Sequence, residues 1–162
     1  MPLYRKYFSK EVKEENGYKA ICEQIVRQWQ EEKLRLHPGA TAQELADFEK
    51  ENGLKLPDSF CYLYSLVNGM DSGSDKADFC LWSLAEIQEK VERARPEQGN
   101  TFPATEIPFG DFLIDSHRYC LATNGDNQYF VKIEGADGEK LADNFTGFLV
   151  RYLSEPEKIY LW

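Results

Sequence analysis

The 162-residue sequence predicts a single α+β domain, with a mostly antiparallel sheet and helices packed on one face of it. Apolar residues recur at helical spacing through the first half of the chain and again near its end. The second half instead contains short runs rich in β-forming residues, separated by turns. Helices, then a meander of strands, then a helix are typical of the α+β class. Hydrophobic residues make up 42% of the chain, which is enough for one core.

Residues 1–38 are expected to form a polar arm and one amphipathic helix. The arm, residues 1–16, is polar and mixed in charge. The helix is predicted over residues 17–36, and His37-Pro38-Gly39 should break it. Its apolar positions are Ile21, Cys22, Ile25, Val26 and Trp29.

Residues 40–69 predict two short helices with clear ends. Thr41 and Glu44 have the spacing of a capping box at the start of the first helix, and Asn52-Gly53 should end it. Pro57 suits the first turn of the second helix, and Asn68-Gly69 is expected to close it.

A loop over residues 70–77, a strand over residues 78–82 and a short helix are predicted next. Ser83 and Glu86 repeat the capping-box spacing at the start of this helix. Residues 95–102 should form a surface loop.

The second half of the chain predicts three strands, two turns and a final helix. The strands are expected at residues 112–114, 119–122 and 129–133, and the turns at residues 124–127 and 135–138. The apolar face of the final helix comprises Phe145, Phe148, Leu149 and Tyr152. The tail, residues 154–162, ends in an apolar run that should add an edge strand or cover a partner surface.

The net charge of −9 is unevenly distributed. Residues 40–162 hold 11 Lys and Arg against 22 Asp and Glu, while residues 1–39 hold 8 against 6. An acidic body repels nucleic acid, whose binding requires clustered cations, and attracts a basic protein. Solubility alone is the other explanation of such a charge.

The four cysteines lie far apart and form no C-x-x-C pair. Each falls in an apolar pattern, so neither a disulfide framework nor a zinc site is expected, and a reducing cytoplasm fits best. The N-terminus lacks the apolar region of a secretory signal, and no stretch is apolar and long enough to span a membrane.

Candidate sites are few. His117 with Asp115, or with Asp111, is the one pattern that suits acid–base catalysis, but residues 114–118 equally fit a polar turn. Residues 71–78 contain five acidic or hydroxyl side chains with a glycine, yet they lack calcium-loop spacing. We therefore expect no catalytic residue, metal or cofactor. The carboxylates form a candidate acidic rim for a cationic protein, or else solubilise the surface: Asp71, Asp75, Asp78, Asp111 and Asp115.

Four motifs in order resemble those of the SUKH superfamily, which includes fungal Smi/Knr regulators of cell-wall glucan synthesis and bacterial immunity proteins. The first is residues 40–69, with its Gly-Leu-x-Leu-Pro joint and closing Asn-Gly. The others are residues 79–84, with a tryptophan before a helix; the Pro-Phe-Gly joint at 108–110; and residues 141–149, which resemble the closing helix. After Pro-Phe-Gly this chain lacks the further glycine that relatives commonly carry.

The resemblance implies a SUKH-like domain over residues 39–153 and a non-enzymatic, protein-binding function. It implies an immunity protein that neutralises a toxin domain, often a nuclease, with a regulatory scaffold as the alternative and a small hydrolase as the least supported one. In that family the region around the tryptophan borders a groove, which makes Trp82 and Tyr62 candidate partner-binding residues beside the acidic rim. The partner would be a basic protein, not nucleic acid or a membrane.

Overall fold

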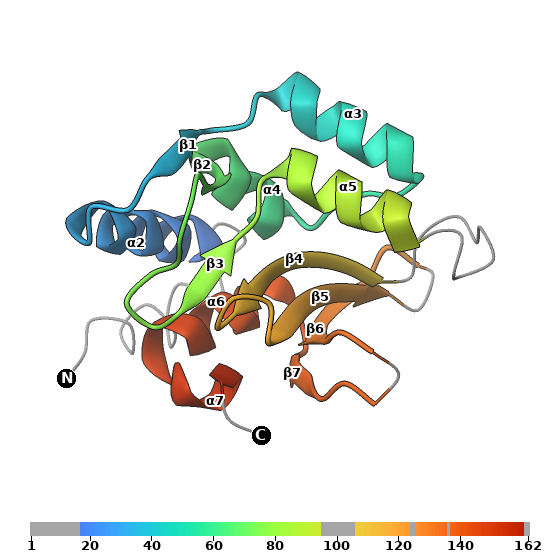
Figure 1. Cartoon of the computed structure of the whole chain (residues 1–162). Helices are drawn as coiled ribbons and strands as arrows, with labels where there is room; N and C mark the ends of the chain where they lie inside the picture. Colours follow the sequence, from blue (N-terminus) through green and yellow to red (C-terminus); the bar gives the residue numbers. More distant parts are fainter. Residues whose placement is uncertain (1–16, 95–105, 124–125, 136, 161–162) are drawn as a thin grey trace.

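The computed structural model describes residues 17–94, 106–123, 126–135 and 137–160. Within these ranges the chain forms six helices, a five-stranded antiparallel sheet and a two-stranded sheet (Figure 1). The predicted class, a single α+β domain with a mostly antiparallel sheet, is confirmed.

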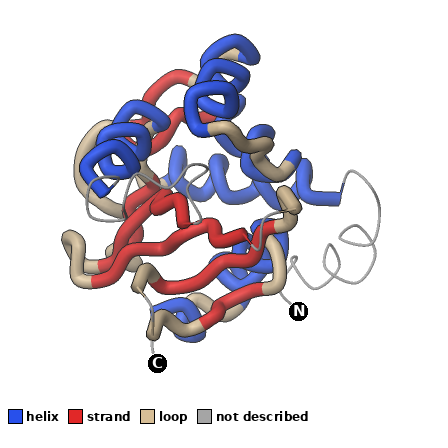
Figure 2. Tube along the Cα trace, turned by 90° about the vertical axis from the view of Figure 1, so that its right-hand side faces the viewer, coloured by secondary structure: helices blue, strands red, loops and turns tan. Residues whose placement is uncertain are grey.

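The large sheet has the strand order β3-β4-β5-β6-β7, so each strand pairs with its neighbour in the sequence. The strands are β3 (Phe79–Leu81), β4 (Glu106–Phe112), β5 (His117–Thr123), β6 (Tyr129–Ile133) and β7 (Lys140–Ala142). Figure 2 shows this meander as adjacent strands on one side of the molecule. This topology places the C-terminal end of β4 between the start of β3 and the start of β5. The candidate site described below lies around this part of the sheet.

The helices are α2 (Gly17–Glu31), α3 (Ala42–Asn52), α4 (Asp58–Leu66), α5 (Leu84–Ala94), α6 (Phe145–Ser154) and α7 (Glu157–Tyr160). Helix α6 packs on β6 and β7, and α2 and α4 pack on α6. In Figure 1, α3 and α5 lie above the sheet and α7 below it.

The core is built from aromatic side chains where helices and sheet meet. Phe109 of β4 contacts Phe60 of α4 and both Phe145 and Phe148 of α6. Phe79 of β3 stacks on Trp29 of α2. Alternate residues of β3, β4 and β5 face this core, so the residues between them are left for the opposite face of the sheet.

Both predicted capping boxes are confirmed. In α3, Thr41 Oγ1 accepts a hydrogen bond from Glu44 N at 3.1 Å, and Thr41 N donates to Glu44 Oε2 at 2.8 Å. In α5, Glu86 N donates to Ser83 Oγ at 3.2 Å, and Ser83 N donates to Glu86 Oε1 at 3.3 Å.

The region around residues 36–38 and 67–70 differs from the prediction. Helix α2 ends at Glu31, and the expected break forms strand β1 (Leu36–Pro38). Asn68-Gly69 does not simply close a helix, because it lies in strand β2 (Val67–Met70), which pairs with β1. The pairing joins segments about thirty residues apart, so local helix signals did not reveal it.

The expected strand at residues 112–114 is also wrong. Strand β4 starts earlier and contains the Pro-Phe-Gly joint, with a bulge between Pro108 and Gly110. Leu113, Ile114 and Asp115 instead form the turn between β4 and β5, each with a positive φ. Their β propensity is overridden by closure of the hairpin.

The tail is helical where it is described. Helix α7 covers Glu157–Tyr160, and Ile159 is fully buried, with its carbonyl oxygen accepting a hydrogen bond from Tyr119 Oη at 3.0 Å. An edge strand is therefore wrong up to residue 160, while Leu161 and Trp162 lie outside the described residues, as do residues 1–16 and the predicted loop at 95–102. Strand β7 was not predicted, and α6 starts only at Phe145.

Candidate protein-binding face

The joint between β3 and α5 holds the backbone of Trp82 from three sides. Trp82 N donates to the carbonyl oxygen of Phe109 at 2.9 Å. The carbonyl oxygen of Trp82 accepts from Tyr64 Oη at 2.6 Å. Asn68 Oδ1 accepts from Leu84 N at 2.9 Å, so strand β2 caps the start of α5. The joint is thus fixed by α4, β2 and β4 together.

Gly69 allows β2 to approach this joint closely. Its φ is +81°, and a Cβ atom there would lie 2.4 Å from Ser83 N. No other residue type fits without moving backbone. The Asn-Gly pair therefore serves the placement of Trp82, a role that the sequence pattern alone does not reveal.

The Trp82 indole lies under a layer of charged side chains. The residue is only 4% exposed, and its Nε1 donates to Asp111 Oδ2 at 3.0 Å. Lys90 Nζ lies 5.2 Å and Arg118 Cζ 5.5 Å from the ring, within the range of cation–π attraction. Trp82 therefore supports the face rather than forming its outer surface.

Arg118 connects this layer to the β4–β5 turn. Its guanidinium donates to both carboxylate oxygens of Asp115, at 2.6 and 2.9 Å, and lies 3.7 Å from Glu134. The Arg118 pair lowers the pKa of Asp115. Burial raises the pKa of Asp111, and the hydrogen bond from Trp82 opposes that shift. Bidentate pairs of this kind fix geometry as well as charge.

The turn itself, which we call the tip (Leu113, Ile114 and Asp115), is unusual in conformation. The three φ angles are +50°, +49° and +67°, a region that side chains other than glycine rarely adopt. Leu113 is 48% and Ile114 93% exposed. Leu113 N donates to the carbonyl oxygen of Asp78 at 3.0 Å, which ties the tip to the β2–β3 loop.

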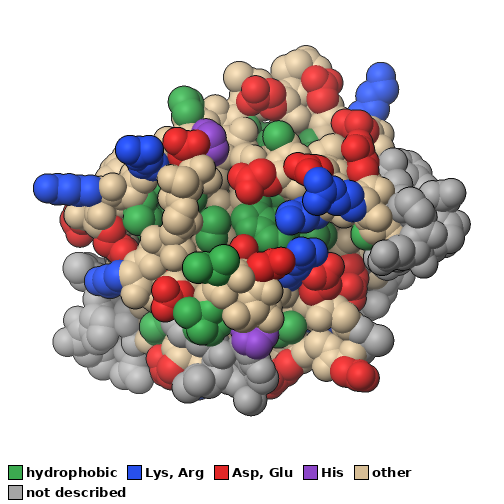
Figure 3. Space-filling model, viewed as in Figure 1, with side chains coloured by type: hydrophobic (Ala, Val, Ile, Leu, Met, Phe, Trp, Pro, Cys, Tyr) green, Lys and Arg blue, Asp and Glu red, His purple; other side chains and the backbone are tan. Residues whose placement is uncertain are grey.

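Five carboxylates and two cations lie at the tip or around Trp82: Asp78, Glu86, Asp111, Asp115 and Glu134 with Lys90 and Arg118. Figure 3 looks onto this face and shows apolar side chains near its centre with acidic and basic ones around them. The surface is therefore negative on balance, with an apolar projection.

The predicted partner-binding residues lie in four places. Asp78, Asp111, Asp115 and Trp82 come together on this face. Asp71 lies further away, with its Oδ1 3.6 Å from His37 Nε2. Tyr62 lies on α4 beside α2, where its hydroxyl donates to Glu23 Oε1 at 2.6 Å.

Asp75 is buried, with 4% exposure, and takes no part in any surface. Its Oδ1 accepts from Ala77 N at 2.8 Å and from Phe79 N at 3.0 Å. Tyr152 Oη donates to Oδ2, and Trp29 Nε1 in turn donates to Tyr152 Oη at 2.7 Å. Its role is to hold the β2–β3 loop against α2 and α6.

The two carboxylates predicted to pair with His117, Asp111 and Asp115, accept hydrogen bonds from Trp82 and Arg118. Asp115 is engaged by Arg118, while the His117 ring stacks on Phe112 with centroids 5.8 Å apart. In the described part of the chain, no group of three or more His, Cys, Asp or Glu is arranged to hold a metal ion.

All four cysteines are free thiols. Burial raises the pKa of Cys22 and Cys80 to about 12 and that of Cys61 to about 11, and it raises that of Cys120 further. Thiols of this kind stay protonated near neutral pH, so they are poor nucleophiles.

Lys90, Arg118 and Glu134 were not predicted as members of the site. They come from α5, β5 and the end of β6, and they meet only through the sheet register. The one signal in the sequence was the Asp115-x-x-Arg118 spacing across a turn.

The fold and this face together define a small α+β domain with an acidic, partly apolar surface. Residues 39–151 match the SMI1/KNR4 family (SUKH-1). The chain therefore belongs to the SMI1/KNR4 family. A search of curated proteins finds no matching relative. None of the described helices has both the length and the apolar character needed to cross a membrane.

Proposed function

We propose that this protein is a non-enzymatic binding module that acts as an immunity protein, neutralising a basic toxin domain such as a nuclease by covering its active surface. Family membership supports the general role. The observation that carries the proposal is the tip: Ile114, at 93% exposure, projects from an anchored turn among carboxylates.

Charge and apolar contact have separate tasks in this mechanism. The carboxylates attract a cationic surface over distance and raise the rate of encounter. Leu113 and Ile114 then bury apolar area at the centre of the contact, where binding energy concentrates. The bidentate Asp115–Arg118 pair holds the tip in place before binding, so little conformational entropy is lost on association.

The test is capture of the partner from the native cells by the tagged protein, followed by affinity measurement with the identified partner. We expect one basic, toxin-like protein whose binding weakens at high ionic strength. Ile114→Asn should weaken binding about tenfold or more, because an apolar contact is lost. Asparagine tolerates a positive φ better than isoleucine, so this variant should be at least as stable as the wild type.

Asp78→Asn should slow association, since it removes one carboxylate beside the tip. Glu51→Gln, an equal change of charge on the exposed side of α3, is the matched control and should leave binding unchanged. Equal binding by all three variants and the wild type would contradict the proposal. Capture of several wall-synthesis proteins in place of a toxin would favour the regulatory-scaffold alternative.

A further inference from the structure

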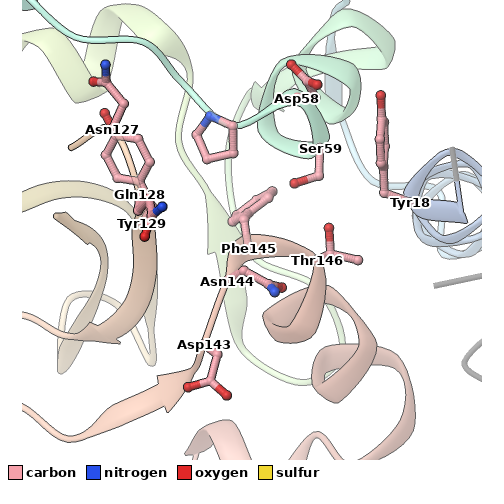
Figure 4. Close-up of a pocket in the computed structure, with 11 residues that line it drawn as sticks. Tyr18, Asp58, Ser59, Asn127, Gln128, Tyr129, Asp143, Asn144, Phe145 and Thr146 are labelled. Carbon is pink, nitrogen blue, oxygen red and sulfur yellow. The ribbon is translucent and has the colours of Figure 1, made fainter. Parts of the chain in front are cut away.

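A cleft of about 440 Å³ opens between the first turns of α4 and α6, away from the tip (Figure 4). Pro57 and Phe145 supply apolar walls, and residues 127–129 form the side opposite Tyr18. None of the lining residues belongs to the Trp82 face.

Ser59 gives the cleft an unused hydrogen-bond donor. The residue is 5% exposed, and its hydroxyl makes no hydrogen bond within the described part of the chain. Figure 4 shows this hydroxyl directed into the cleft, toward Phe145 and Thr146. The hydroxyl is open to the cleft, so it can donate to an acceptor that a ligand supplies. Among the described residues the buried side-chain atoms without a hydrogen-bond partner include Tyr129 Oη, which belongs to the same cleft, and a buried hydroxyl normally has a partner.

Two helix N-termini add positive potential at the same place. Helix α4 has nine residues and begins after Pro57, which has no side chain to cap the first amides. Helix α6 has ten residues, and Asn144 Oδ1 accepts only from Gly147 N, at 2.7 Å. The remaining first-turn N–H groups and helix dipoles favour a negatively charged acceptor.

The charges around the cleft favour a ligand that carries a single negative charge. No Lys or Arg lines it, whereas Asp58 and Asp143 do. Both carboxylates point away from its centre in Figure 4, and Asp143 pairs with Lys140 at 2.6 Å. A doubly charged phosphate would be repelled more strongly than a singly charged carboxylate.

We propose that this cleft binds a carboxylate carried on a short apolar chain. The carboxylate accepts hydrogen bonds from Ser59 Oγ and from the first-turn amides of α4 and α6, and the apolar chain lies against Pro57 and Phe145. Both a free organic acid and the C-terminus of a peptide carry this chemistry.

The test is an NMR titration of the full chain with butyrate, with neutral butyramide and with inorganic phosphate. Butyrate should shift the amide signals of Ser59, Phe145 and Thr146, and butyramide should not. Ser59→Ala should weaken butyrate binding about tenfold, the loss expected for a hydrogen bond to a charged group. Asp58→Asn should tighten it, because a repelling charge is removed.

Ser65→Ala is the matched control, since Ser65 lies at the other end of α4 and donates to the carbonyl oxygen of Tyr62. Outside the helix, Ser59 bonds through its carbonyl oxygen, which accepts from Cys22 Sγ at 3.7 Å, and Ser59→Ala leaves that bond in place. Should this variant still fold poorly, the comparison of butyrate with butyramide on the wild type tests the proposal. Equal shifts with butyramide, tighter binding of phosphate, or unchanged affinity in the folded cleft variants would overturn the proposal. Blocked dipeptides with a free or an amidated C-terminus then identify the source of the carboxylate. If the dipeptide with the free C-terminus binds and the amidated one does not, the source is a peptide C-terminus. If butyrate binds and neither dipeptide does, the source is a small organic acid.

Discussion

At the scale of the single residue, Asp75 shows how a carboxylate can be structural. A rim of five aspartates was the expectation, but this one turns inward and accepts three hydrogen bonds. Burial raises the pKa of Asp75, and the hydrogen bond from Tyr152 opposes the shift. The folded state therefore holds a proton on Asp75 more tightly than the unfolded chain does.

This difference predicts a specific pH dependence of stability. Between about pH 4, where the unfolded carboxyl group titrates, and the raised pKa of the folded state, the folded state binds more protons. The free energy of unfolding of the wild type should thus fall as pH rises through this window. Asp75→Asn lacks that dependence. Urea unfolding of both proteins over a pH series measures it, and parallel stability curves would show the prediction to be wrong.

At the scale of the element, the β1–β2 pair shows where local signals stop being sufficient. Asn68-Gly69 carries a correct helix-end signal, because α4 does end just before it. That these residues form a strand depends on β1, about thirty residues away, and their support of Trp82 depends on α5. The capping boxes, by contrast, span four residues each and were predicted correctly.

Gly69→Ala should lower the free energy of unfolding by at least about 2 kcal/mol, since a positive φ and a backbone clash act together. Gly73→Ala is the matched control: its φ is +80° against +81° at Gly69, but a Cβ there meets nothing within 4 Å. It should cost only about 1 kcal/mol. Thermal and denaturant unfolding give both values. Equal costs would mean that the close approach at Ser83 is not important.

The candidate site was predictable in the same uneven way. Trp82, Asp111 and Asp115 stand out from the sequence through their positions beside a strand end and a Pro-Phe-Gly joint. Arg118 and Lys90 do not, because their contact with Trp82 depends on how β5 aligns with β4 and where α5 lies. Tyr62 is an aromatic residue within the family-like motifs, as Trp82 is, yet its side chain contacts α2.

At the scale of the whole molecule, the family match starts at residue 39 but the core does not. Helix α2 precedes it and contributes Ile21, Ile25 and Trp29, all buried. Burying each such side chain stabilises the fold by about 1.5–3 kcal/mol, and a domain is stable by only about 5–15 kcal/mol in total. Helix α2 is therefore an integral part of the domain.

A chain of residues 39–162 alone should lack cooperative unfolding and dispersed amide signals. Near-UV circular dichroism and NMR spectra measure this directly. A synthetic peptide of residues 17–38, added in excess, should restore native spectra by docking on α4 and α6, and a scrambled peptide should not. Native spectra from residues 39–162 without the peptide would contradict the essential role of α2.

The hydrogen bond from Trp29 to Tyr152 joins residues 123 positions apart, and it has a consequence for synthesis in the cell. As the chain leaves the ribosome, α2 emerges first but its partner α6 emerges nearly last. The apolar face of α2 must wait for most of translation without its native cover. Nascent chains arrested before residue 145 should accordingly recruit chaperones at this helix, and release should follow once α6 is outside the exit tunnel.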